Sequence, residues 1–203
     1  MGDMQTAIEF TNHCNFKCVY CPHSVYKMET GRNVFDREKG YMSDDVFNAI
    51  LPNLNKYSRD LTLGFFGEST LHPKFNEYVD KLAYKKKYKL ILNSNCSLLT
   101  KNDDQTLRKF NMFRISMDSP VESEWQDQCP GGNVIDINGN TSSDRLRVLQ
   151  EKTLYWLSLK SRPTISLIYV TSSRNIKTID QFAKKWCKYL RGGDMIIVKR
   201  MLT

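Results

Sequence analysis

Short apolar runs alternate with amphipathic helical patterns along almost the whole chain, and this alternation constrains the fold more than any other feature of the sequence. The first run alternates apolar and polar residues, as a half-buried strand does. The six predicted strands cover residues 6–11, 61–66, 89–92, 113–117, 164–170 and 195–198. Because strands that alternate with helices form right-handed parallel units, the sequence predicts an α/β fold with a parallel sheet.

Five amphipathic helices are predicted between these strands. The most regular one places Ile179, Phe182 and Trp186 on one face, at the spacing of successive helical turns. Ser43 is suited to cap an earlier helix, and Pro73 to open the next one. Periodicity leaves two architectures open, a doubly wound sheet and a partial barrel. In both, the functional loops lie at the carboxyl ends of the strands.

One stretch, at about 118–142, is long for a loop and is predicted to be an irregular insertion after the fourth strand. Its Asn138-Gly139 pair, preceded by Val134 and Ile135, predicts a small hairpin or turn. No internal repeat or low-complexity linker is found. At 203 residues the chain has the length of one domain, so a single domain over 1–203 is predicted.

The sequence predicts a cytoplasmic protein that does not span a membrane. No stretch approaches the roughly 18 consecutive apolar residues of a membrane span. The first five residues have neither the basic region nor the apolar core of a signal peptide, and thiols in the cytoplasm stay reduced. A chain of this size needs no disulfide for its core, so its six cysteines call for another explanation.

Thirty Lys and Arg residues against 22 Asp and Glu residues give a net charge of +8, which is compatible with anionic substrates or nucleic acid. The densest basic run, Lys85 to Lys87, falls at the end of a predicted helix. This basic run is therefore predicted to be a solvated surface.

Three cysteines follow the first predicted strand within eight residues, as Cys14, Cys18 and Cys21. Three such thiolates can bind three corners of an iron-sulfur cluster and leave the fourth iron open to a substrate or cofactor. The alternative is a zinc site, which usually needs four ligands. The fourth ligand would then be His13, His23, Cys96, Cys129 or Cys187.

Four short motifs, each after a predicted strand, resemble those of the radical S-adenosylmethionine (radical SAM) enzymes. They are Cys14-x3-Cys18-x-Tyr20-Cys21, Phe66-Gly67-Glu68-Ser69, Ser94-Asn95-Cys96 and Ser116-Met117-Asp118. Three positions depart from the family pattern. Phe66 replaces a Gly, Ser69 replaces a Pro, and Cys96 stands where the family usually has Gly.

The resemblance implies a partial (β/α)6 TIM-like barrel. It also implies that Cys14, Cys18 and Cys21 hold a [4Fe-4S] cluster whose open iron binds S-adenosyl-L-methionine (SAM). Electrons from a reductant protein such as flavodoxin or ferredoxin would cleave SAM to a 5′-deoxyadenosyl radical. The radical would abstract hydrogen from a small sugar-like or nucleoside-like molecule, or from a peptide.

The resemblance assigns cofactor contacts to the remaining motif residues. Gly67 lets the backbone approach a ligand closely, and the Glu68 carboxylate can accept a hydrogen bond from the SAM ammonium group. Tyr20 would lie beside the adenine. The short polar side chains expected at the ribose hydroxyls and the methionine carboxylate are Ser94, Asn95, Ser116 and Asp118.

Cys96 and Cys129 are candidate hydrogen-atom donors to a substrate radical, and inert packing is the alternative for both. Cys187, next to Trp186, is expected in the core. The chain ends just after the sixth strand, so no cysteine-rich extension with further clusters is expected within it.

A second class of function stays open, a zinc- or cluster-stabilised nucleic-acid-binding module without catalysis. Such a module would bind duplexes in a salt-dependent way. Because no basic and aromatic residues are interleaved as in single-strand binders, nucleic acid is not the expected partner.

Overall fold

A computed structural model describes residues 5–22 and 38–200 of the chain. All six predicted strands are present and form one sheet, in the order β1-β2-β3-β4-β7-β8. Every neighbouring pair is parallel. The strands are β1 (Gln5–Ile8), β2 (Asp60–Leu63), β3 (Lys89–Ser94), β4 (Met112–Ser116), β7 (Thr164–Thr171) and β8 (Met195–Arg200).

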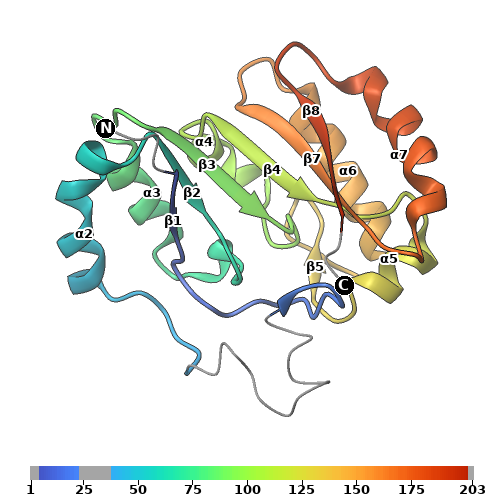
Figure 1. The fold of residues 1–203 in the computed structure, drawn as a ribbon, viewed down its shortest axis with the longest axis horizontal. Helices are drawn as coiled ribbons and strands as arrows, with labels where there is room; N and C mark the ends of the chain where they lie inside the picture. The colour runs from blue at the N-terminus through green and yellow to red at the C-terminus, as the bar shows by residue number, and fades with distance from the viewer. Residues whose placement is uncertain (1–4, 23–37, 201–203) are drawn as a thin grey trace.

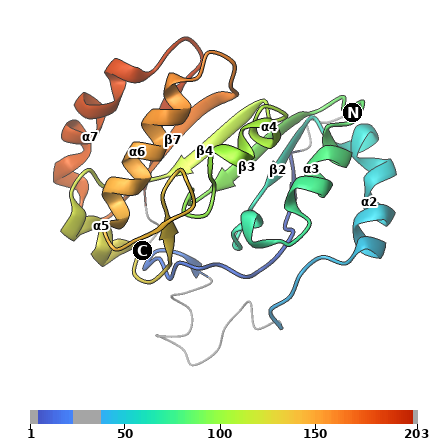
Figure 2. The ribbon, with the colours of Figure 1, turned by 180° about the vertical axis from the view of Figure 1, so that it is seen from behind.

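The order of the strands decides between the two architectures that periodicity left open. Each strand pairs with the next strand of the large sheet along the chain, so right-handed crossovers place the connecting helices on the same face. Figures 1 and 2 show this arrangement, with the strands in front in one view and α3, α4 and α6 in front in the other. The sheet is thus a partial barrel with one face covered by helices.

The predicted helices are present, two of them in shorter form. They are α2 (Asp44–Tyr57), α3 (Phe75–Ala83), α4 (Asp104–Leu107), α6 (Arg145–Ser158) and α7 (Ile179–Trp186). Short 3-10 turns precede α4 and follow α7, at Lys101–Asp103 and Cys187–Tyr189. Ser43 caps α2 as expected, since its side chain accepts a hydrogen bond of 3.3 Å from the backbone N–H of Val46.

The predicted insertion contains a helix that the sequence analysis missed, α5 (Glu122–Gln128). Trp125 and Gln128 are its buried residues, so the segment lacks the apolar periodicity that marks a helix. The predicted hairpin is confirmed. It pairs β5 (Val134–Ile135) with β6 (Thr141–Ser142), and Gly139 in its turn has a φ of 96°.

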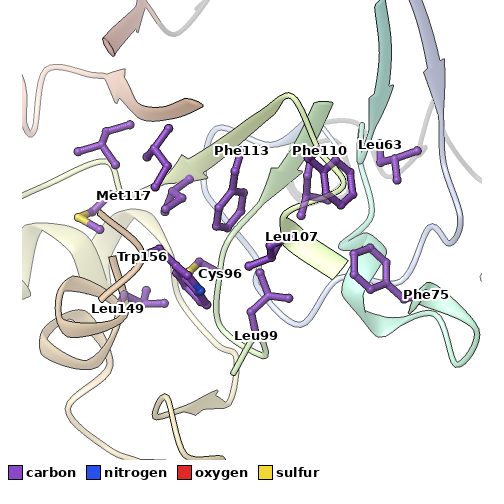
Figure 3. Packing of buried hydrophobic residues seen from close by; sticks show 14 of the residues in the cluster. Leu63, Phe75, Cys96, Leu99, Leu107, Phe110, Phe113, Met117, Leu149 and Trp156 are labelled. Carbon is purple, nitrogen blue, oxygen red and sulfur yellow. The ribbon is translucent and has the colours of Figure 1, made fainter. Parts of the chain in front are cut away.

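The hydrophobic core lies between the sheet and the helices. Alternate residues of each strand point into it, as Leu61 and Leu63 of β2 do, and both are fully buried. From the helix side, Trp156 of α6 meets Phe113 of β4 edge to face, with the ring centroids 5.6 Å apart (Figure 3).

A buried ion pair fixes the last strand at the amino ends of the sheet. Arg162, before β7, and Asp194, before β8, form a bidentate contact, with Nη2–Oδ2 at 2.6 Å, and their side chains are 2% and 1% exposed. Burial by itself would raise the pKa of Asp194. Hydrogen bonds from Arg162 and from the backbone outweigh burial and lower that pKa. None of the helices in the described ranges is long and apolar enough to cross a membrane.

Candidate cluster and cofactor site

The cysteine loop leaves the carboxyl end of β1 and is held in place by the insertion. The backbone N–H of Lys17 donates to the carbonyl of Pro130, and that of Val19 donates to the carbonyl of Gln128, both at 2.9 Å. Phe16 also forms a β-bridge with Gly131. The insertion between β4 and α6 therefore fixes the backbone that presents the cysteines.

The three thiols of this loop are half-buried and close enough to interact electrostatically. Burial raises the pKa of Cys14 to about 12. A hydrogen bond from the Phe16 backbone opposes this rise, and the charges of Glu68, Cys18 and Cys21 add to it. A bound metal cation reverses this preference, because metal ligation deprotonates a thiol. The donor set therefore fits an iron-sulfur cluster.

The thiols do not converge on one point. Within residues 5–22 and 38–200, no three His, Cys, Asp or Glu side chains are gathered closely enough to hold a single metal ion. Zinc needs such convergence, whereas the cysteines of a cluster each bind a different iron. His23, one of the alternative zinc ligands, lies outside the described residues.

Glu68 is a buried carboxylate at the carboxyl end of β2, next to the cysteine loop. Its Oε1 accepts hydrogen bonds from Ser94 Oγ at 2.9 Å and from Thr70 Oγ1 at 2.8 Å, and its Oε2 accepts one from the backbone N–H of Asn95 at 2.8 Å. Burial raises its pKa, and these hydrogen bonds partly offset that rise. A carboxylate oxygen can accept two hydrogen bonds, so Oε2 can still accept one from an ammonium group.

Gly67 is needed for a contact within the protein. A Cβ atom built on Gly67 would lie 1.8 Å from the carbonyl oxygen of Thr11, so this glycine lets the loops after β1 and β2 touch. The sequence predicts a close approach of Gly67 to a ligand, and the structure shows a close approach to the backbone of Thr11.

Glu9 is a residue of this site that the sequence analysis missed. Its Oε1 accepts hydrogen bonds from the backbone N–H groups of Phe66, at 3.1 Å, and Gly67, at 2.9 Å. These bonds tie the end of β1 to the loop that carries Glu68. The only signal in the sequence is an acidic residue directly after the first strand.

Ser94 and Asn95 connect the Glu68 carboxylate to the cysteine loop. Ser94 Oγ, besides its bond to Glu68, accepts from the backbone N–H of Cys96 at 2.9 Å. Asn95 Nδ2 donates to Asn15 Oδ1 at 2.9 Å, and Asn95 Oδ1 accepts from Ser97 Oγ at 2.6 Å. Both side chains thus position their neighbours. Their direct contacts to SAM stay a prediction.

Cys96 follows β3 and turns its side chain into the core. Its φ of 63° is a left-handed conformation that glycine adopts without strain, which explains why a Gly suits this position. The side chain is fully buried in the core that includes Trp156 and Leu149 (Figure 3), and burial raises its pKa to about 12. This placement on the helix-covered side favours packing over hydrogen-atom donation.

Three of the predicted residues meet at one buried point beside the cysteine loop. The hydroxyl of Tyr20 donates to Asp118 Oδ2, and Cys129 Sγ lies 3.7 Å from the same oxygen. Asp118 Oδ1 accepts a hydrogen bond of 2.8 Å from the backbone N–H of Val170 in β7. Asp118 thus joins the cysteine loop, the insertion and β7. The proposed roles of these three residues toward SAM or substrate stay predictions.

Two other predicted positions differ in their environment. Ser116 ends β4 and is partly exposed, and its side chain makes no hydrogen bond within the described part of the chain. It is available to a ligand. The expectation that Cys187 packs in the core is wrong, because Cys187 is exposed. The chain changes from α-helix to a 3-10 turn at Cys187, which takes this residue off the apolar stripe of α7.

Replacing Asp118 with Asn is expected to remove a pH-dependent part of the stability of the cluster-free protein. Burial raises the pKa of Asp118 from 3.8 to about 6. Between pH 3.8 and about pH 6 the folded protein binds more protons than the unfolded chain. The free energy of unfolding therefore falls as pH rises through this interval. A change of two pKa units corresponds to about 3 kcal/mol.

Urea unfolding at pH 4 and pH 6.5 measures this effect. Asp118→Asn should lose less stability than the wild type over that interval, since all other groups titrate in both proteins. An identical loss in the two proteins would show that Asp118 ionises as freely in the folded state as in the unfolded chain.

Comparisons with known proteins agree with the fold described above. The sequence matches the family model described as the Radical SAM superfamily over residues 8–151. The fold is similar to that of Streptococcus suis SuiB bound to S-adenosylmethionine, with a TM-score of 0.75 and 13% identity over 99% of this chain and 41% of that one. No curated protein matches the sequence.

Two peptide-bound structures also share the fold. SuiB bound to the precursor peptide SuiA has a TM-score of 0.72 and 13% identity, over 98% of this chain and 40% of that one. Native anSMEcpe with bound AdoMet and the Cp18Cys peptide has a TM-score of 0.65 and 19% identity, over 100% of this chain and 52% of that one. This chain therefore spans about half of their length or less.

Proposed function

Since this chain belongs to the radical SAM superfamily, we propose that it is an enzyme that reductively cleaves SAM at a [4Fe-4S] cluster held by Cys14, Cys18 and Cys21. The observation that carries the proposal is the position of Glu68. Its buried carboxylate keeps one acceptor site, and Asn95, whose backbone N–H donates to Glu68 Oε2 at 2.8 Å, has its side-chain Nδ2 4.0 Å from Cys14 Sγ, the first cysteine of the loop. A cluster ligand and an acceptor for the SAM ammonium group are thus neighbours.

Each residue of the site has a separate task in this proposal. The three cysteines bind the cluster as thiolates. Glu68 binds the ammonium group in its ionised form, held by the hydroxyl of Ser94 and the backbone N–H of Asn95. A bound cluster, reduced by one electron, would supply the cleavage of SAM to methionine and a 5′-deoxyadenosyl radical, and this radical would abstract a hydrogen atom from the substrate.

The substrate is proposed to be a peptide or a small polar molecule such as a sugar or nucleoside. Two proteins of the same fold hold peptides in their solved structures, which supports the peptide. The electrons are proposed to come from a reductant protein such as a flavodoxin or ferredoxin.

Anaerobic reconstitution with iron and sulfide tests the proposed function. After reduction, the protein should give the electron paramagnetic resonance signal of a [4Fe-4S] cluster, SAM should perturb that signal, and 5′-deoxyadenosine should be released slowly. Stoichiometric zinc without a cluster, together with salt-dependent binding to arbitrary duplexes, would contradict the proposal and favour the nucleic-acid-binding module.

A further inference from the structure

The face of the sheet opposite the helices carries a row of polar side chains in its middle. Asn93 of β3 is the register partner of Arg114 of β4, and Arg114 is the partner of Ser166 of β7. Residues beside them in the same strands, Phe113 and Leu167, belong to the core. Since side chains alternate along a strand, the row lies on the face of the sheet that the helices do not cover in Figure 1, which we call the open face.

Ser166 has a buried hydroxyl that lacks a partner among the described residues. The residue is 0% exposed, and its Oγ makes no hydrogen bond to any group in residues 5–22 and 38–200. A buried hydroxyl normally has a partner, and leaving one without a partner costs free energy. A ligand oxygen that accepts a hydrogen bond from this hydroxyl would recover that cost.

Arg114 is a cation without an anionic partner in the described part of the chain. Its side chain is partly exposed, and Arg114 Nε contacts Met112 Sδ at 3.3 Å. No carboxylate forms an ion pair with it among residues 5–22 and 38–200. A guanidinium keeps its charge at every ordinary pH and binds carboxylate or phosphate oxygens with two parallel hydrogen bonds.

A second cation reinforces the positive charge of this face. Lys199 of β8 is the register partner of Val170 of β7, four residues after Ser166, so it shares the open face. Burial raises the pKa of Asp118, and the charge of Lys199 is close enough to oppose that rise. The carboxylate of Asp118 is already engaged by Tyr20, Cys129 and the Val170 backbone.

We propose that Arg114 and Ser166 form a binding site for an anionic group, carboxylate or phosphate, of the substrate. The site itself follows from this geometry, and the statement that its ligand is the substrate rests on the proposed function. Arg114 lies two residues before Ser116 at the carboxyl end of β4, which is a distance of roughly 7 Å along the strand. A molecule anchored there would extend toward the loops that carry the cysteines and Glu68.

Titration with inorganic phosphate and with acetate, at constant ionic strength, tests the site in the protein without cluster or SAM. Calorimetry or protein NMR gives the affinity. Arg114→Gln should weaken binding at least about tenfold, because a charge-assisted bidentate contact is lost, and Ser166→Ala should weaken it several-fold. The matched control is Arg108→Gln, which removes the same charge from an exposed position after α4.

Equal affinities of Arg114→Gln and Arg108→Gln, or no binding by the wild type, would overturn the proposal. Arg114→Lys keeps the charge but not the bidentate geometry, so its affinity should lie between those of the wild type and Arg114→Gln. Folding of each variant is checked by its thermal unfolding curve.

A second arm distinguishes two sources of the carboxylate, the substrate and SAM itself. Binding of SAM to the reconstituted protein is measured for the wild type and Arg114→Gln. A tenfold loss of SAM affinity would assign Arg114 to the methionine carboxylate and would overturn the substrate site. Phosphate binding by a protein that never cleaves SAM would contradict the proposed function and leave the anion site supported.

Discussion

Replacing Cys18 with Ala is expected to abolish assembly of the cluster and to lower formation of 5′-deoxyadenosine more than about 100-fold. Loss of a residue that merely supports a metal ligand already costs about 10- to 100-fold, and Cys18 is a proposed ligand itself. Two thiols remain in the loop after the substitution, which leaves two irons of the cluster without a protein ligand.

Iron content, the visible absorption of the reconstituted protein and the yield of 5′-deoxyadenosine measure this result. Cys187→Ala is the matched control, because Cys187 is an exposed cysteine of a 3-10 turn after α7 and should keep full iron content. Full iron content and turnover in Cys18→Ala would place the cluster elsewhere.

Replacing Gly67 with Ala is expected to destabilise the protein by more than about 4 kcal/mol and to lower its Tm by about 10 °C. The added Cβ would overlap the carbonyl oxygen of Thr11 at 1.8 Å. Thr11 cannot easily give way, since its hydroxyl donates to the Gly40 carbonyl at 2.7 Å and its backbone bridges to Tyr41. The two loops must therefore separate.

This separation also affects the cofactor site. The backbone N–H of Glu68 donates to the carbonyl of His13 at 2.8 Å, and moving the loop breaks that bond. Thermal unfolding and SAM binding should both report the damage. Gly192→Ala is the control, since a Cβ there meets no atom within 4 Å. A Gly67→Ala protein as stable as Gly192→Ala would show that the loops after β1 and β2 do not touch.

The sequence alone was sufficient to predict the secondary structure that forms the barrel. The strands and all but one of the helices in residues 5–22 and 38–200 carry their own signal, because an element that buries one face must repeat apolar residues at its own period. The exception, α5, has buried Trp125 and Gln128 and so shows no such repeat. The three cysteines were also found, since cluster ligands this close together form a local motif.

The remaining parts of the site depend on contacts between segments far apart in the chain. Glu9 bonds to Phe66 and Gly67, and Asn15 bonds to Asn95, across separations of 57 to 80 residues. A local pattern contains no signal for such pairs.

The sequence by itself determined the order of strands and helices and the cysteine motif, because both are set by residues close together in the chain. Only the tertiary structure decided what the other polar residues do. It placed Cys96 in the core and Asp118 among protein partners, and within residues 5–22 and 38–200 it gave Arg114 no carboxylate and the Ser166 hydroxyl no hydrogen bond. The burial and the hydrogen bonds of a side chain depend on every segment that surrounds it. They can therefore be assigned only once the fold of the whole chain is known.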